Sequence, residues 1–169
     1  MAHLAISEAA AAQFQLDIVV WSISSVTLGK EDVLHPSIDD RMAVIERTVE
    51  RSTFLDFQVT EVQLLVELAA DFDVLIMGAD KWHQINEPHW YGGEAARDKM
   101  LARLPQLAIA ERPPFVVPKH ARLDLPASVT RHISSTAARE GASWQMLPEA
   151  REFAEETGAW LDPERYDLR

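Results

Sequence analysis

Three consecutive hydroxyl residues followed by an arginine form the stretch of this sequence that is best suited to binding an anion. Ser134, Ser135 and Thr136 precede two alanines, and Arg139 follows them. Ser and Thr side chains accept hydrogen bonds from the free amides of a first helical turn. Those amides and the helix dipole also favour a phosphate group, and an arginine one turn later can bind phosphate oxygens in pairs. The stretch therefore indicates either a phosphate cradle or an ordinary capped helix with a solvated arginine.

The composition limits the chemistry that the chain can perform. Its 169 residues contain no cysteine, which excludes disulfides, thiolate metal ligands and a cysteine nucleophile. The net charge of -11 disfavours nucleic acid and anionic membranes as partners, and no apolar run is long enough to span a bilayer. The histidines lack Zn-type spacing, so we assign no metal ligand among them. We expect a cytoplasmic protein that binds small-molecule nucleotides, and the sequence leaves open whether it forms a homo-oligomer.

Strand-like and helix-like segments alternate along most of the chain. Apolar runs predict strands at residues 17–24, 54–59, 73–78 and 106–110, the last ended by Glu111-Arg112-Pro113-Pro114. Helical patterns cover residues 3–14, 37–49, 94–104 and 148–157, and Thr60 to Gln63 resembles a capping box that opens another helix through Ala70. This alternation predicts a single α/β domain over residues 1–169. We expect a Rossmann-like, doubly wound parallel sheet with helices on both faces.

Polar residues follow the carboxyl ends of two predicted strands, which is where such sheets bind ligands. Lys30 lies in the loop after the first strand, and Gly78-Ala79-Asp80 follows the third. Arg41 falls in the N-terminal half of a helix, where the helix dipole disfavours a cation. Either a phosphate or a salt bridge to Asp39 or Asp40 would offset that cost.

Three segments resemble the nucleotidylyltransferase superfamily, which carries an H-x-G-H signature. They are Gly78-Ala79-Asp80, Ile133 to Arg139, and Leu147 to Trp160. Within the superfamily, the chain is most similar to bacterial nicotinate or nicotinamide mononucleotide adenylyltransferases. The resemblance implies a single-step transfer of AMP from ATP to a mononucleotide phosphate. Such a reaction uses Mg²⁺, releases pyrophosphate and forms no covalent intermediate.

The same resemblance assigns roles to individual residues. Trp82 would stack on a flat base or a pyridine ring of the acceptor. The expected catalytic residues are His3, Lys30 and Arg139. The residues expected to bind ATP are Arg41, Gly78, Ala79, Asp80, Ile133, Ser134, Ser135 and Thr136.

The N-terminus departs from the family pattern. Met1-Ala2-His3 aligns with the second half of H-x-G-H, with Ala2 in place of the glycine, so that the first histidine and the first strand are missing. A missing central strand would leave two neighbouring strands with unpaired edges. Two explanations stay open, namely a misassigned start codon and a nucleotide-binding relative that lacks activity.

The identity of the acceptor is also open. Thr60 to Gln63 does not match the Ser-Tyr-Thr-like segment of the nicotinate-specific members. Another phosphorylated acceptor, such as phosphopantetheine or glycerol phosphate, is one alternative. A structural domain that uses an open sheet edge to pair with another chain is a further one.

Overall fold

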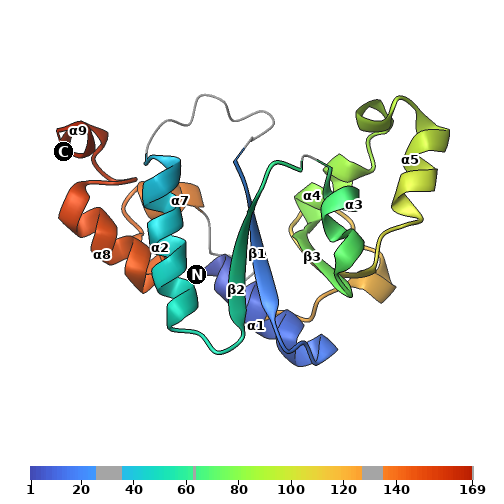
Figure 1. The fold of residues 1–169 in the computed structure, drawn as a ribbon, viewed down its shortest axis with the longest axis horizontal. Helices are drawn as coiled ribbons and strands as arrows, with labels where there is room; N and C mark the ends of the chain where they lie inside the picture. The colour runs from blue at the N-terminus through green and yellow to red at the C-terminus, as the bar shows by residue number, and fades with distance from the viewer. Residues whose placement is uncertain (26–35, 63, 127–134, 169) are drawn as a thin grey trace. The chain divides into compact units, whose positions relative to one another are not determined.

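The computed structural model describes residues 1–25, 36–62, 64–126 and 135–168, and it confirms the α/β fold class (Figure 1). The strands are β1 (Val19–Ser24), β2 (Leu55–Thr60), β3 (Val74–Gly78) and β4 (Gln106–Ala110). The α-helices are α1 (Ala2–Phe14), α2 (Ile38–Glu50), α3 (Leu65–Leu68), α4 (Ala79–Ile85), α5 (Glu94–Leu101), α7 (Ser135–Arg139), α8 (Pro148–Thr157) and α9 (Pro163–Asp167). In this described part of the chain the strands form two parallel pairs, β1–β2 and β3–β4.

The chain divides into two compact units, which we describe separately. The first unit comprises Met1–Ala2, Asp17–Glu61 and Ile133–Arg169, and the second comprises His3–Leu16 and Val62–His132. No helix of the described residues is long and apolar enough to cross a membrane.

In the first unit, strands β1 and β2 run in parallel from Val19 opposite Leu55 to Ser24 opposite Thr60. Helix α2 begins as the sequence predicts, because the Ser37 side chain accepts a hydrogen bond of 3.1 Å from the Asp40 amide. Helix α8 packs on α2 through a buried apolar cluster made by Val44, Phe153 and Ala159. Val44 is therefore the residue of α2 that this packing buries.

The C-terminal end of the first unit is tied to the start of α2. Gly158 ends α8 in the left-handed conformation, with φ of 84°, as the sequence predicts for this glycine. Helix α9 follows and was not predicted from the sequence. Its Tyr166 hydroxyl accepts a hydrogen bond of 2.8 Å from the Ser37 amide and donates one to the Asp40 carboxylate. Helix α9 therefore fixes the N-terminus of α2 through Tyr166.

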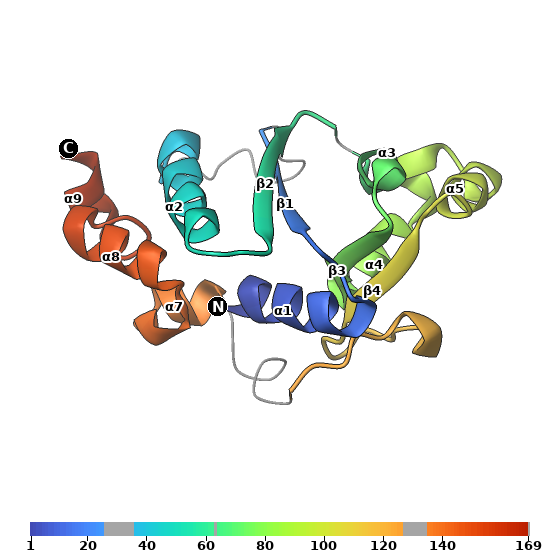
Figure 2. The same cartoon turned by 60° about the horizontal axis from the view of Figure 1, so that its bottom comes forward.

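In the second unit, the β3–β4 pair is covered by helices on both faces (Figure 2). Val74 and Ile76 of β3 pack on one face, together with Ala10 of α1. Leu75 and Met77 pack on the other face, against residues of α3, α4 and α5. This alternation follows from the period of two along a strand, and it explains why the strand sequence is apolar throughout.

The prediction of a capping box at Thr60 is wrong. Thr60 belongs to β2, where it pairs with Ser24, so its backbone is extended where a helix would have to begin. Helix α3 begins only at Leu65, and Leu64 before it makes no side-chain cap hydrogen bond. Strand pairing therefore overrides a local signal that is compatible with a helix start.

Candidate functional site

The junction of β3 and α4 places three of the predicted site residues side by side. Gly78 is the last residue of β3 and the N-cap of α4, and its backbone is extended, with φ of -79° and ψ of 155°. Ala79 is fully buried beneath the junction, whereas the Asp80 side chain is 48% exposed. The sequence prediction that this triplet follows a parallel strand is confirmed.

Gly78 leaves room for the carboxylate of Asp80. A Cβ atom at position 78 would lie 2.5 Å from Oδ1 of Asp80, which is closer than two such atoms can approach. The carboxylate therefore folds back over the strand end because residue 78 has no side chain. The backbone at Gly78 is itself of a kind that any residue can adopt, so the requirement for glycine here is one of space.

Arg112 is a charged neighbour of this junction that was not predicted from the sequence. Its Nη1 lies 3.4 Å from Oδ2 of Asp80, and its side chain is 60% exposed. Arg112 is the second residue after β4, and β4 is the parallel neighbour of β3. Since parallel neighbours end at the same edge of a sheet, the residues after β4 were the signal that could have identified it.

Trp82 lies one turn into α4 and is half-buried. Its ring packs against the apolar cluster that includes Met77, Ile85 and Ile109. The Trp82 carbonyl accepts a hydrogen bond of 2.7 Å from the Asn86 amide group. Packing accounts for the position of this ring, and stacking on an acceptor stays a prediction.

The phosphate-binding candidates belong to the first unit, apart from His3. Arg41 lies in the first turns of α2, where its Nε donates a hydrogen bond of 3.4 Å to the Ser37 carbonyl. Arg139 is the exposed last residue of α7, and α7 is described from Ser135 onward. Lys30, Ile133 and Ser134 lie outside the described residues, as do the side chains of Ser135 and Thr136.

His3 lies in the first turn of α1, as predicted, and its side chain keeps contact with solvent. Protein atoms around the ring lower the pKa of His3 from its ordinary value by desolvation, and the N-terminal ammonium lowers it further. The neutral imidazole is therefore favoured at neutral pH. A neutral imidazole can accept a hydrogen bond or donate one, but it does not supply a positive charge to a phosphate.

His3→Gln is expected to make the stability of the protein less sensitive to acid. Because the folded-state pKa of His3 lies below the unfolded value of 6.5, the unfolded chain binds a proton first as the pH falls through 6.5. Stability is therefore lost in that range, and glutamine removes the effect. Melting temperatures at about pH 7.5 and about pH 5.5 should differ by roughly a degree less in the variant than in the wild type. An unchanged difference, equal to that of the control variant His89→Gln, would contradict this expectation.

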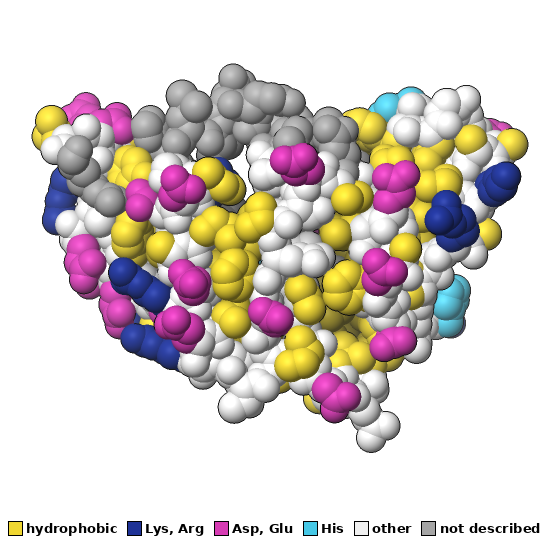
Figure 3. Space-filling model, viewed as in Figure 1, with side chains coloured by type: hydrophobic (Ala, Val, Ile, Leu, Met, Phe, Trp, Pro, Cys, Tyr) yellow, Lys and Arg dark blue, Asp and Glu magenta, His cyan; other side chains and the backbone are white. Residues whose placement is uncertain are grey.

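Carboxylates in the described residues are scattered rather than clustered. Figure 3 shows Asp and Glu side chains dispersed over the visible surface, with few Lys and Arg side chains between them. Within these residues no group of three His, Asp or Glu side chains could hold a metal ion. Mg²⁺ held by the described residues would thus need oxygen ligands besides their side chains, and nucleotide phosphates commonly supply such ligands.

Residues 1–141 match the family model described as cytidylyltransferase-like. No curated protein matches the chain. The match includes the β3–α4 junction, the loop with Arg112 and the whole of α7.

Proposed function

Because the chain belongs to the cytidylyltransferase-like family, we propose that it transfers AMP from ATP to nicotinate or nicotinamide mononucleotide, forming a dinucleotide and pyrophosphate. Family membership supports nucleotidyltransferase activity in general. The choice of ATP as the nucleotide donor and of a pyridine mononucleotide as the acceptor is what we propose beyond it. The observation that carries the proposal is the Gly78-Ala79-Asp80 junction. It presents a backbone turn and a carboxylate at the carboxyl end of a parallel strand, where sheets of this kind bind nucleotides.

The proposed reaction is a single displacement. A phosphate oxygen of the acceptor attacks the α-phosphorus of ATP, and a new P–O bond forms. The bond between the α-phosphorus and the oxygen bridging to the β-phosphate breaks, and the electron pair leaves with pyrophosphate. Catalysis of this kind depends on placing two anionic groups and on stabilising the charge that develops between them.

Individual residues have separate roles in the proposal. Gly78, Ala79 and Asp80 line the nucleotide site, where Asp80 accepts a hydrogen bond from the nucleotide. Cations and hydroxyl groups bind the phosphates, namely Lys30, Arg41, Ser134, Ser135, Thr136 and Arg139. Ile133 belongs to the same ATP-binding segment. His3 forms hydrogen bonds as a neutral imidazole. Trp82 stacks on the ring of the acceptor.

Mg²⁺ fits the proposal as an ion that arrives with the triphosphate. The carboxylate of Asp80 lies just after the end of β3, and Arg112 already lies beside it. Mg²⁺ is usually held by one or two carboxylates together with substrate phosphates. When bound, the ion would neutralise negative charge on the phosphates. The side chains would then need only to orient those phosphates.

A pyrophosphate-release assay tests the proposal. The purified protein is incubated with Mg²⁺ and either ATP or CTP, with nicotinate mononucleotide, nicotinamide mononucleotide, phosphopantetheine or glycerol phosphate as acceptor. We expect release with ATP and a pyridine mononucleotide. Release only with CTP, or only with one of the other acceptors, would show that the protein uses a different substrate from the one proposed. It would still be a nucleotidyltransferase of this family. Calorimetric binding of ATP without turnover on any acceptor would instead favour a nucleotide-binding protein without transferase activity.

A further inference from the structure

Helix α9 folds back over the end of α8, which brings Tyr166 to the start of α2. A Cβ atom at position 158 would lie 2.7 Å from the Asp162 carbonyl oxygen and 3.1 Å from the Tyr166 amide nitrogen. Gly158 therefore allows this close approach because it has no side chain. The Asp162 side chain then caps α9 by accepting a hydrogen bond of 3.1 Å from the Arg165 amide. Tyr166 packs against the buried cluster between α2 and α8, so its ring is held in place.

Tyr166 and Arg41 are both hydrogen-bonded to Ser37, the N-cap of α2. The Ser37 amide donates a hydrogen bond of 2.8 Å to the Tyr166 hydroxyl. The Ser37 carbonyl accepts one of 3.1 Å from the Arg41 amide and one of 3.4 Å from Arg41 Nε. The residue that supports the Arg41 side chain is therefore itself held by α9.

The Tyr166 hydroxyl also donates a hydrogen bond to the carboxylate of Asp40, the residue just before Arg41. Within the described part of the chain, Arg41 forms no ion pair with a carboxylate. Adjacent residues of these types can pair, because Arg97 and Asp98 of α5 do so at 2.7 Å. Of the two ways of offsetting the charge of Arg41, the structure therefore leaves open the one that uses a phosphate.

We propose that Tyr166 is a positioning residue of the phosphate site, which keeps the Asp40 carboxylate away from Arg41 so that the guanidinium group can bind the triphosphate. This inference rests on the proposed function, which gives Arg41 a phosphate contact. The hydrogen bond to Ser37 engages one of the five N–H donors of the guanidinium group. A carboxylate and a phosphate match the same planar fork, so Asp40 at Arg41 would compete with ATP.

Tyr166→Phe tests the inference, because it removes the hydroxyl group and keeps the ring that packs. We expect ATP to bind about fivefold more weakly, since an exposed ion pair between Asp40 and Arg41 would contribute up to about that factor. Adenosine, which has no phosphate, should bind as it does to wild type. Adding Asp40→Asn should restore ATP binding to within about twofold of wild type, because the competing charge is gone. Calorimetric titrations and thermal melts of the same samples measure affinity and folding separately.

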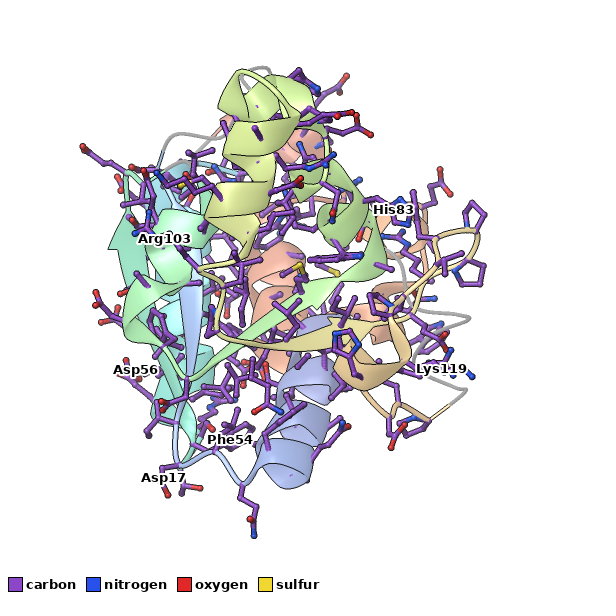
Figure 4. All side chains as sticks on the ribbon, turned by 90° about the vertical axis from the view of Figure 1, so that its right-hand side faces the viewer. Asp17, Phe54, Asp56, His83, Arg103 and Lys119 are labelled. Atoms are coloured by element: carbon purple, nitrogen blue, oxygen red, sulfur yellow. The ribbon has the colours of Figure 1, made fainter. Side chains whose placement is uncertain are left out.

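Two other carboxylates of the first unit provide the matched controls. Asp39 lies in the same first turn of α2, and Asp56 is exposed on β2 (Figure 4). Asp39→Asn and Asp56→Asn each remove the same charge, and neither should restore ATP binding to Tyr166→Phe. Equal restoration by all three asparagine variants would show a general charge effect, and it would overturn the inference. A loss that Asp40→Asn does not restore would overturn it as well, since Tyr166 would then act through the fold alone.

Turnover separates this inference from the proposed function. Wild-type turnover with ATP affinity unchanged in Tyr166→Phe would overturn the inference and leave the proposed function intact. The expected pattern of ATP binding without turnover on any acceptor would support the inference and contradict the transferase activity. A wild-type protein that binds no ATP would overturn both.

Discussion

Gly78→Ala is expected to weaken ATP binding by about tenfold to a hundredfold while the protein stays folded. The new Cβ atom would lie 2.5 Å from Oδ1 of Asp80, so the carboxylate must turn away from the strand end. That movement costs little stability, because the atom to be displaced is the far end of a side chain and the backbone at residue 78 suits alanine. Calorimetric titration with ATP and a thermal melt of the same sample measure the two effects.

A double-mutant cycle tests whether Gly78→Ala acts through Asp80. Asp80→Ala alone should weaken ATP binding to a similar degree, because it removes the displaced group itself. In the Asp80→Ala background, Gly78→Ala should then have almost no further effect, since the two residues are in contact and their effects are not additive. Fully additive losses would contradict the account, as would a melting temperature that falls in step with affinity.

Arg139→Ala is expected to weaken ATP binding by about tenfold to a hundredfold and adenosine binding by less than about twofold. The proposal gives Arg139 a contact with the triphosphate, which adenosine lacks. Because Arg139 is exposed at the end of α7, its removal should scarcely change the stability of the fold. Binding of ATP, AMP and adenosine to the variant, measured at one ionic strength, gives the comparison.

Arg151→Ala provides the matched control. Arg151 is likewise exposed on a helix of the first unit, where it lies 4.0 Å from Glu155. Its removal changes the net charge by the same amount, so it reports the general electrostatic effect on a triphosphate. If Arg139→Ala and Arg151→Ala weaken ATP binding equally, or if adenosine is lost together with ATP, Arg139 has no specific phosphate contact.

The sequence predicts much of this fold because most elements carry strong local signals. Strand β4 and helix α8 lie at the residues predicted, since each is bounded by residues that allow no continuation. Proline opens α8 and glycine closes it, while Glu111 to Pro114 ends β4. Thr60 shows the limit, because it is compatible with a helix start and becomes the last paired residue of β2 instead. Only the partner strand decides between these two outcomes.

The positions of some candidate site residues could be predicted because those residues are neighbours in the sequence. Gly78, Ala79 and Asp80 are adjacent in sequence, so a local motif places them together. Arg112 is separated from Asp80 by 32 residues, and the contact exists because β3 and β4 are neighbours in one parallel sheet. Strand order cannot be inferred from a single strand pattern. The phosphate roles of Ser134, Ser135, Thr136 and Arg139 stay predictions, since they depend on the resemblance.

Transfer of a labelled α-phosphate tests the central claim most directly. ATP radiolabelled at the α-phosphate is incubated with the protein, Mg²⁺ and nicotinate mononucleotide, and the products are separated by chromatography. The account predicts that the label moves into a dinucleotide in step with pyrophosphate release, and that Gly78→Ala and Arg139→Ala both slow this transfer. Label that stays in ATP, or that enters a dinucleotide only when labelled CTP replaces ATP, would contradict the proposed adenylyl transfer.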